Sequence, residues 1–387
     1  MRSDDWKNSG FGLYIHWPFC QALCPYCDFN SYVAEHIDQT RWANAYQSEI
    51  ERISFETKGR VLSSVFFGGG TPSLMLPETV ATLLENIRAT WIVSNDFEVT
   101  LEANPTSVEI AKFQAFRDAG VNRISLGIQA LNDADLCRLG RLHTAKEGIS
   151  AFDIAQKCFD QVSFDLIYAR QYQTPKAWKA ELDQALHMNA GHVSLYQLTI
   201  EEKTSFGVRF RNGKLPGLPE ENAAADMYDI TQDACTAAGL FGYEVSNHAH
   251  PGQEARHNLI YWRGGDYAGI GPGAHGRLTT GGCRIATETV LSPMKWLQHI
   301  EIKGNGEIAR QHLTPDMHAQ EYIMMSLRLS EGCDMHRYKS LGGRDLDPIK
   351  LSFLTDLNLI VVEDRHVKTT TSGRRVLNAI LKELLIV

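Results

Sequence analysis

Three cysteines, Cys20, Cys24 and Cys27, lie close together in "CQALCPYCDF". Thiolates are soft ligands that suit iron–sulfur clusters or zinc. Structural zinc takes four protein ligands, usually as two short pairs, and neither a fourth thiol nor a suitably spaced His16 completes such a set here. Three thiolates can hold a [4Fe–4S] cluster and leave one iron open for a small molecule. The spacing therefore favours a cluster, with structural zinc as the alternative.

Polar residues and glycines follow several other apolar runs. The run "FFGGGTPS" places three glycines before Thr71, where the backbone can approach a ligand closely. Glu102 and Asn104 end the run "FEVTLEA", and a carboxylate there can accept from ribose hydroxyls. Asp165 interrupts the apolar run "SFDLIY", and a buried carboxylate usually has a partner or a function. Taken singly, each of these also fits an ordinary turn or strand end.

The segments that carry these residues predict a parallel sheet. Six apolar runs, rich in β-branched and aromatic residues, alternate with segments of helical periodicity. Such β/α units predict an α/β fold, a partial or full parallel barrel, with its site at the carboxyl ends of the strands. The expected strands are 12–17, 63–69, 97–103, 123–129, 162–168 and 192–200.

The chain is long enough for one large domain and a smaller one. We expect a β/α core over 1–205, an extension of the barrel over 206–310, and a small C-terminal helical or winged-helix-like domain over 311–387. A formal net charge of −8 argues against a chain that coats nucleic acid or an anionic membrane. No secretory leader and no membrane span are evident in the sequence, so a cytoplasmic location is expected.

In its first half the sequence resembles the radical S-adenosylmethionine (SAM) superfamily. "CQALCPYC" is similar to the superfamily's cysteine motif and "GGGTP" to its loop for the SAM amino group. The order of "YIHWPFCQALCPYCDF", "FFGGGTPS", "LEANP", "SLGIQ", "LGRLHTA" and "FDLIY" resembles the coproporphyrinogen oxidase-like branch. The resemblance implies a [4Fe–4S] cluster on the three cysteines and SAM contacts from Tyr14, Gly70, Thr71, Pro72, Glu102, Gln129, Arg141 and Asp165.

Two features separate the proteins of this branch. The oxygen-independent coproporphyrinogen III oxidases carry a further cysteine where this chain has Phe29. "HNLIYW", residues 257–262, resembles a motif of the HemW family of haem chaperones. That resemblance implies haem contacts from His257, Asn258, Tyr261 and Trp262. His257 is the first candidate for the iron ligand, with three nearby competitors: His248, His250 and His275.

The resemblance implies a haem chaperone that holds a SAM-ligated cluster and passes haem to acceptor proteins, among them respiratory enzymes. It allows for contact with membranes through such acceptors and for oligomers formed on haem binding. It implies no nucleic-acid partner. The alternative is a radical SAM enzyme that decarboxylates coproporphyrinogen III, because the SAM motifs are common to both, and a zinc-stabilised structural module is a third class.

One stretch departs from the pattern of the family. After the strand that holds Asp165, the family has a turn of the Gly-Leu-Pro type, whereas this chain reads "ARQY" over residues 169–172. Glycine and proline preset a tight turn, so their absence predicts a reshaped loop at the barrel mouth. Arg170 in this loop is expected either to pair with a haem propionate or to be solvated.

Overall fold

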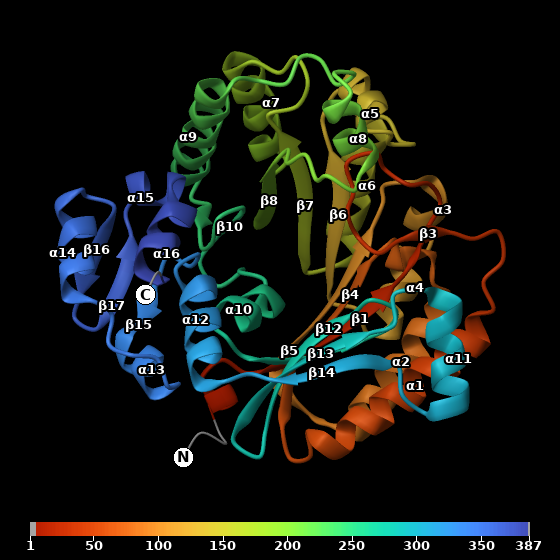
Figure 1. Cartoon of the computed structure of the whole chain (residues 1–387). Helices are drawn as coiled ribbons and strands as arrows, with labels where there is room; N and C mark the ends of the chain where they lie inside the picture. The colour runs from red at the N-terminus through yellow and green to blue at the C-terminus, as the bar shows by residue number, and fades with distance from the viewer. Residues whose placement is uncertain (1–4, 386–387) are drawn as a thin grey trace.

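The computed structural model describes residues 5–385, without the side chains of residues 107 and 108. These residues form one large sheet of twelve strands and, beside it, a smaller domain at the carboxyl end of the chain (Figure 1). The large sheet runs in the order β14-β13-β12-β11-β1-β4-β5-β6-β7-β8-β10-β9. Its two edge strands are not bonded to each other, so the barrel is partial.

The six predicted strands lie side by side and parallel in this sheet, which confirms the expected fold class. The last one ends three residues earlier than predicted, at Gln197. Their carboxyl ends meet at one edge of the sheet. The bounds are β1 (Phe11–Trp17), β4 (Val61–Gly69), β5 (Ile92–Ala103), β6 (Arg123–Gln129), β7 (Gln161–Tyr168) and β8 (His192–Gln197).

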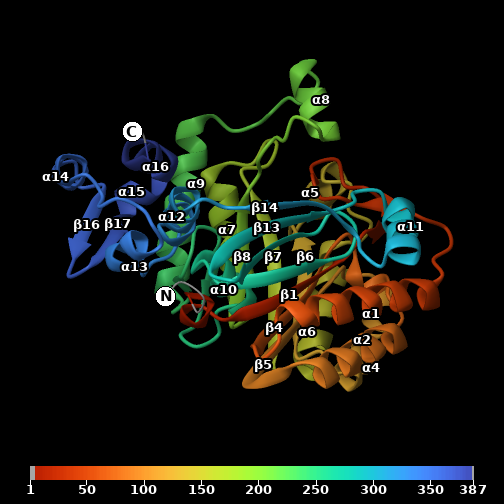
Figure 2. The same cartoon turned by 60° about the horizontal axis from the view of Figure 1, so that its bottom comes forward.

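Amphipathic helices cover the outer face of these strands. The longer ones bury an apolar stripe on the sheet, as Trp178 and Leu182 of α7 do. Local signals set where they begin: Thr144 and Glu147 form a capping box at α6. Figure 2 shows α1, α2 and α4 stacked together on this face. The helices of this layer are α1 (Gln39–Glu56), α2 (Pro77–Thr90), α3 (Ser107–Ile110), α4 (Phe113–Ala119), α5 (Asp133–Arg138), α6 (Ala145–Cys158) and α7 (Pro175–His187).

The middle part of the chain extends the sheet at both edges. β10 (Asn247–Ala249) and β9 (Phe241–Gly242) continue it beyond β8. β11 (Asp266–Ile270) pairs in parallel with β1, and three antiparallel strands follow it, β12 (His275–Thr280), β13 (Cys283–Thr289) and β14 (Glu307–His312). The helices here are α8 (Ser205–Arg211), α9 (Glu221–Ala237), α10 (Arg256–Trp262) and α11 (Pro293–Lys303).

The C-terminal domain has a hydrophobic core of its own, built on residues such as Ile323, Leu354 and Val367. It combines a three-stranded sheet with short helices, as the expected helical domain with a hairpin does. Its elements are α12 (Pro315–Ser326), β15 (Cys333–Asp334), α13 (Met335–Ser340), α14 (Pro348–Asp356), β16 (Ile360–Glu363), β17 (His366–Thr369), α15 (Thr371–Arg375) and α16 (Leu377–Leu385).

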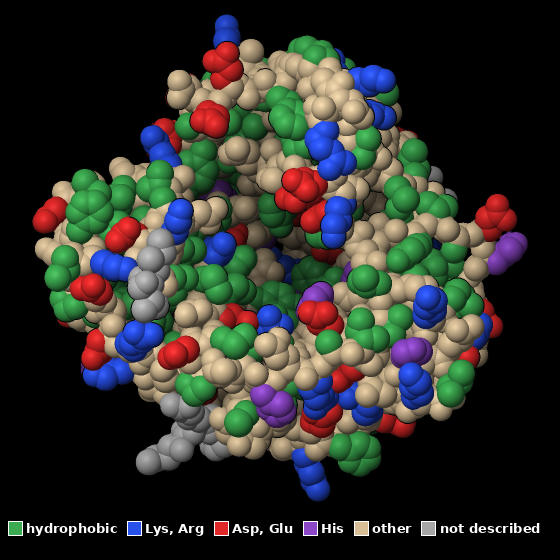
Figure 3. Space-filling model, viewed as in Figure 1, with side chains coloured by type: hydrophobic (Ala, Val, Ile, Leu, Met, Phe, Trp, Pro, Cys, Tyr) green, Lys and Arg blue, Asp and Glu red, His purple; other side chains and the backbone are tan. Residues whose placement is uncertain are grey.

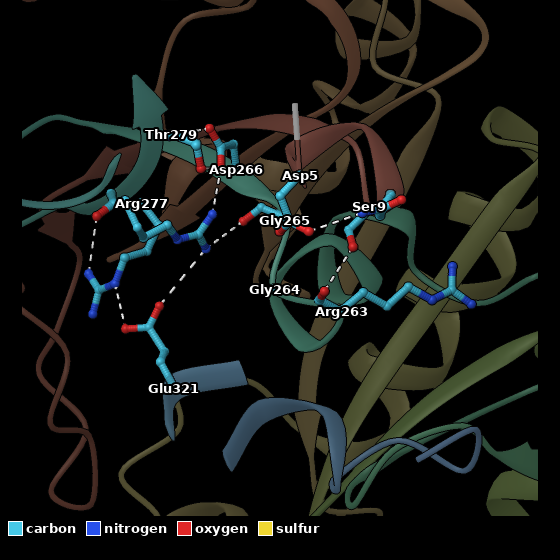
Figure 4. A network of polar contacts seen from close by, with 12 residues as sticks. Asp5, Ser9, Arg263, Gly264, Gly265, Asp266, Arg277, Thr279 and Glu321 are labelled. Atoms are coloured by element: carbon cyan, nitrogen blue, oxygen red, sulfur yellow. Dashed lines mark hydrogen bonds and ion pairs between the residues drawn. The ribbon is translucent and has the colours of Figure 1, made fainter. Parts of the chain in front are cut away.

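Polar contacts fasten this domain to the barrel (Figure 4). Arg337 of α13 forms an ion pair with Asp5 at 2.8 Å, and Glu321 of α12 accepts from Arg277 of β12 at 2.8 Å. Behind them, buried Asp266 accepts from both Arg60 and Arg284. Because these charged side chains pair with one another, the contact between the two parts of the chain is specific.

The expected domain boundaries stay predictions. Residues 1–4 of the first expected domain and 386–387 of the last lie outside the described residues. Within residues 5–385, no helix is both long and apolar enough to span a bilayer.

Candidate functional site

The three cysteines line one pocket at the carboxyl edge of the parallel strands. Cys20 ends β2 (Phe19–Cys20), which pairs with β3 (Tyr32–Val33), and the Cys27 N–H donates to the Cys24 carbonyl at 3.2 Å. The pocket has a volume of about 160 Å³. Residues in or just after β4, β5, β6 and β7, and Arg141 from the loop after α5, complete its wall. They include Gly70, Thr71, Glu102, Asn104, Gln129 and Asp165.

The glycine run after β4 is fastened directly to the cysteine loop. The Gly70 N–H donates to the Trp17 carbonyl at 2.7 Å, and the Thr71 N–H donates to the Phe19 carbonyl at 2.8 Å. A Cβ on Gly70 would lie 2.7 Å from the Phe19 oxygen, which explains the need for glycine. The close approach therefore brings two segments of the chain together, and Pro72 follows as the buried first residue of the turn η2 (Pro72–Leu74).

Arg141 and Thr71 reach the cysteine sulfurs. The Thr71 hydroxyl donates to Cys20 Sγ at 3.4 Å, and Arg141 Nη1 donates to Cys24 Sγ at 3.5 Å. Asn104 joins the two, because its Nδ2 donates to Thr71 Oγ1 at 3.1 Å and its Oδ1 accepts from Arg141. Donors aimed at sulfur stabilise negative charge there, as thiolate ligands require.

Two carboxylates lie deeper in the pocket. Burial, reinforced by the charge of nearby Asp165, raises the pKa of Glu102 to about 8, although its Oε2 accepts from the Gly69 N–H at 3.3 Å. Burial also raises the pKa of Asp165 to about 6, against hydrogen bonds from Ser194 and Ser125. Without a ligand, Glu102 therefore holds a proton at neutral pH.

Gln129 and Arg141 each keep an unused polar atom in this pocket. Gln129 has a φ of 70°, an unusual value for a residue other than glycine. Its Oε1 and the Nε of Arg141 are buried and bond no other described residue. Such atoms usually have a partner, so both fit a polar ligand held against the pocket wall.

Tyr14 and His16 lie behind this wall. The Tyr14 hydroxyl is 3.0 Å from His16 Nδ1, and His16 Nε2 is 2.8 Å from the Asn30 carbonyl oxygen. The pair therefore connects β1 to the end of the cysteine loop. His16 is buried beside Gly69, whose Cβ would meet its ring. A SAM contact from Tyr14 stays a prediction, because its side chain does not line the pocket.

"HNLIYW" forms the helix α10, which closes the opposite end of the barrel, where a half-buried strand or turn was the alternative. His257 is fully enclosed, with Nδ1 2.7 Å from Ser64 Oγ and Nε2 2.6 Å from the Tyr261 hydroxyl. Its ring stacks on Phe66 at 5.2 Å, and burial lowers its pKa to about 3. Both ring nitrogens are thus engaged, so iron coordination by His257 would first require one of these bonds to break.

The other residues of the motif point to different places. Asn258 Nδ2 donates to the Tyr243 hydroxyl at 3.2 Å. Trp262 packs beside Leu329 and lines a groove on the outer surface. The motif therefore spans the barrel end from its interior to its exterior and does not surround one cavity, and the haem contacts of its four residues stay predictions.

The three competing histidines also lie apart. His248 is buried on β10, and the His250 Nδ1 is 2.9 Å from the Gly239 carbonyl oxygen. His275 begins β12 at the mouth of the barrel, where its exposed ring faces Glu288 at 3.9 Å. Among the described residues, no three His, Cys, Asp or Glu side chains gather around a single-ion position.

The loop after β7 corrects the expectation for Arg170. Ala169 adopts a φ of 56° and Tyr172 a φ of 63°, left-handed conformations for which glycine is better suited, and the reshaping of this loop relative to the family stays a prediction. Arg170 is neither solvated nor available to a propionate, because it is buried and forms ion pairs with Asp135 at 2.8 Å and Glu181 at 2.5 Å. The loop is therefore anchored beneath the mouth of the barrel.

Several residues of the pocket were not among the predicted site residues. Ser125, Thr106 and His143 line it, and the His143 Nε2 lies 3.0 Å from the Ile128 carbonyl oxygen. Burial and the neighbouring Arg141 charge lower the pKa of His143 to about 4. Ser125 was detectable in principle, since it shares a face of β6 with Gly127 and Gln129.

Comparisons with known proteins assign the fold to a class. Residues 14–184 match the radical SAM superfamily, and residues 313–376 match the HemN C-terminal domain. A solved structure of coproporphyrinogen III oxidase (HemN) from Escherichia coli superimposes with a TM-score of 0.82 at 21% identity, over 97% of this chain and 90% of that one. The chain therefore has the radical SAM fold.

Curated relatives define the family more closely. The chain is 36% identical over 384 residues to radical S-adenosyl methionine domain-containing protein 1, mitochondrial, from Bos taurus, covering 96% of this chain and 87% of the relative. It is 36% identical to heme chaperone HemW from Haemophilus influenzae, covering 96% of each chain, and 34% identical to that from Bacillus subtilis, covering 96% and 99%. The chain belongs to the HemW family of radical SAM proteins.

The superfamily implies a [4Fe–4S] cluster and SAM, and the residues present fit both. Three thiols line the pocket together, with Thr71 and Arg141 donating to two of them. The unpaired polar atoms of Gln129 and Arg141 and the carboxyl of Glu102 supply groups that an amino acid or a ribose could bind.

Proposed function

We propose that this chain is a haem chaperone that carries a SAM-ligated [4Fe–4S] cluster and transfers haem to acceptor proteins, respiratory enzymes among them. Phe29 carries the proposal: its side chain lines the pocket beside Cys27, in place of the further cysteine of the oxidases. Relatives named heme chaperone HemW support it, at 33–40% identity.

In this proposal the residues of the pocket have separate tasks. Cys20, Cys24 and Cys27 would hold the cluster, and the donors of Thr71 and Arg141 would stabilise charge on the sulfurs. The Gly69–Thr71 backbone, Glu102, Gln129 and Asp165 would bind the amino acid and ribose parts of SAM. When bound, the cluster with SAM on its open iron supplies one-electron chemistry.

Glu102 and Asp165 would set the protonation of the SAM site. With a pKa of about 8, Glu102 is neutral at neutral pH before ligand enters and can donate through its hydroxyl. A ligand that presents hydroxyl donors would instead favour the carboxylate, because a hydrogen bond to a charged oxygen stabilises it. Ligand binding is thus expected to release a proton from Glu102.

The experiment is a haem titration of anaerobically reconstituted protein, followed by absorption spectroscopy, which reports cluster and haem in one sample. Saturable haem binding at about one equivalent is expected. A lack of haem binding by the intact protein would refute the chaperone proposal. A parallel incubation with SAM, a reductant and coproporphyrinogen III tests the alternative, because formation of protoporphyrinogen IX would identify an oxidase.

The cellular setting belongs to the proposal as well. We propose that the chain acts in the cytoplasm and reaches membranes only through its acceptors, with haem-dependent oligomers as a further step. Relatives named mitochondrial also match, so fractionation of cells that express the protein is the measurement that decides. Recovery of the protein chiefly in a membrane or organelle fraction would contradict this setting.

A further inference from the structure

A groove on the outer surface runs between α10, α12 and α16, which Figure 1 shows next to one another. It has a volume of about 610 Å³ and is widely open to solvent. We call it the Trp262 groove. Its lining residues are Trp262, Met324, Met325, Arg328, Asn378, Leu381, Lys382 and Leu385.

The lining is apolar with two cations at its rim. Trp262, Leu381 and the two methionines supply the apolar surface. The Arg328 guanidinium lies 5.7 Å from the centre of the Trp262 ring. The hydrogen bond of Arg328 goes to the Met324 carbonyl, and its charge also interacts with the Glu244 carboxylate, although the two form no ion pair. Lys382 forms no ion pair with another described residue.

An apolar trough that carries Arg328 and Lys382 is complementary to a flat apolar molecule that bears two carboxylates. Haem has this chemistry, with a hydrophobic macrocycle and two propionates at one edge. The groove also offers a metal ligand: Met324 is 39% exposed, and thioether sulfur is an established axial ligand of haem iron. A lipid or an apolar peptide would use the trough but would not need both cations and a thioether.

We propose that haem docks in the Trp262 groove, against the indole of Trp262, with its propionates toward Arg328 and Lys382 and its iron within reach of the Met324 sulfur. This inference rests on the proposed haem binding and adds where the haem sits. It assigns the "HNLIYW" motif two roles. His257 and Tyr261 fix α10 inside the barrel, and Trp262 at the end of the same helix contacts the haem.

The fixed position of His257 supports this division. Its bond to Ser64 holds the first turn of α10 against β4, and its bond to Tyr261 lies within the helix. Trp262, at the end of the helix, is only five residues further along the chain. Trp262 is therefore held in place on the outside by contacts made within the barrel. Haem on the groove would leave those contacts intact, whereas haem on His257 would break one of them.

The test is haem titration of the full-length, reconstituted protein and three groove variants: Trp262→Ala, Met324→Leu and the double variant Arg328→Glu/Lys382→Glu. We expect the Kd to rise about tenfold or more in Trp262→Ala and in the double variant. Met324→Leu should change the visible spectrum of the bound haem. Matched controls are Met317→Leu on the same helix and Lys58→Glu in the turn between α1 and β4, both expected to bind as the unaltered protein does.

Metal-free protoporphyrin IX separates ligation from docking. Its binding should weaken in Trp262→Ala and in the double variant but not in Met324→Leu, because it has no iron to ligate.

Unchanged haem affinity in both docking variants would overturn the inference while leaving the chaperone proposal intact, whereas no haem binding by the unaltered protein would refute both. An unchanged haem spectrum in Met324→Leu would refute the thioether ligand. If light scattering shows that the groove variants lose a dimer but keep haem affinity, the groove is an interface between copies and the inference fails.

Discussion

The Nδ1 atom of His257 lies 2.7 Å from the Oγ atom of Ser64, so the histidine of the "HNLIYW" motif is bonded to β4, a central strand of the barrel. Its other nitrogen meets the Tyr261 hydroxyl at 2.6 Å. A residue that the sequence places among candidate haem ligands therefore also holds a helix in position. Loss of haem in a His257 variant would not by itself distinguish these roles.

The Ser64–His257 bond leads to a paired experiment. His257→Ala should lower the free energy of unfolding by about 2–4 kcal/mol, since it empties a buried site and leaves two hydroxyls unpaired. Ser64→Ala should cost about 1–2 kcal/mol through the unpaired nitrogen. Urea denaturation measures both, with Asn258→Ala as a milder neighbour. If His257 ligates iron, only His257→Ala loses haem; if it holds α10, haem affinity falls in step with stability in both variants.

The raised pKa of Glu102 predicts a pH dependence of stability in the ligand-free protein. Its folded pKa of about 8 exceeds the ordinary value of 4.5, so the folded state binds the extra proton between these values. Stability is therefore full below about pH 4.5 and falls as the pH rises toward 8. Glu102→Gln should stabilise the ligand-free protein at pH 8.5 by about 1–3 kcal/mol, a range kept low because the pocket admits water.

Thermal unfolding at a series of pH values measures this effect. The difference between Glu102→Gln and the unaltered chain should vanish near pH 4.5 and be largest above pH 8. Exposed Glu85→Gln on α2 is the matched control and should show no such slope. A pH-independent difference would show that folding does not raise the pKa of Glu102. SAM affinity should fall in Glu102→Gln if the proposed ribose contact is correct.

Ala169 predicts a gain in stability from a single change. Its left-handed φ of 56° is costly for a residue with a Cβ, and glycine removes that cost. Ala169→Gly should raise the free energy of unfolding by about 0.5–1 kcal/mol, after the entropy that glycine adds to the unfolded chain. Ala180→Gly, in the helix α7, is the control and should instead lose about 1 kcal/mol. A loss in both variants would show that the conformation carries no strain.

Arg170 predicts a large loss of stability, because two carboxylates depend on it. Removing its charge in Arg170→Met leaves Asp135 and Glu181 facing each other in a buried site, which should cost about 3–5 kcal/mol in denaturant unfolding. Arg138→Ala removes the more exposed partner of Asp135 and should cost less than about 1 kcal/mol. Equal effects would contradict a buried ion network. The difference in stability between Arg170→Met and the unaltered protein should become smaller in acid, where Asp135 is protonated. Arg170 helps hold the pKa of Asp135 below its usual range, although burial acts to raise it.

Much of the fold was predictable because its signals are local. Apolar strands such as 63–69 and 162–168 are buried on both faces and read as continuous runs, and the cysteines stand where the first strand ends. The same rule brought Gly70, Glu102 and Asp165 together, since the carboxyl ends of parallel strands share one edge.

What the sequence could not predict depends on contacts between distant segments. The partners of Arg170 come from α5 and α7, so its burial has no local signature. The helix at 256–262 has only seven residues, and polar and apolar side chains are mixed along it. Its packing into the end of the barrel, and not a local sequence signal, therefore makes it helical. Ala169 adopts a left-handed conformation that a residue with a Cβ disfavours, because the ion pairs of Arg170 hold the loop in place.

The bonds from Gly70 and Thr71 to the carbonyls of Trp17 and Phe19 are made entirely by backbone atoms. None of them uses a cysteine sulfur, so we expect the beginning of the cysteine loop to keep its place without iron, unlike small zinc modules that fold only around their metal. If oxygen removed the iron, the cysteine loop would then keep its position. Damage of this kind could be repaired in the folded chain by fresh iron and sulfide, with no need for new synthesis of the protein.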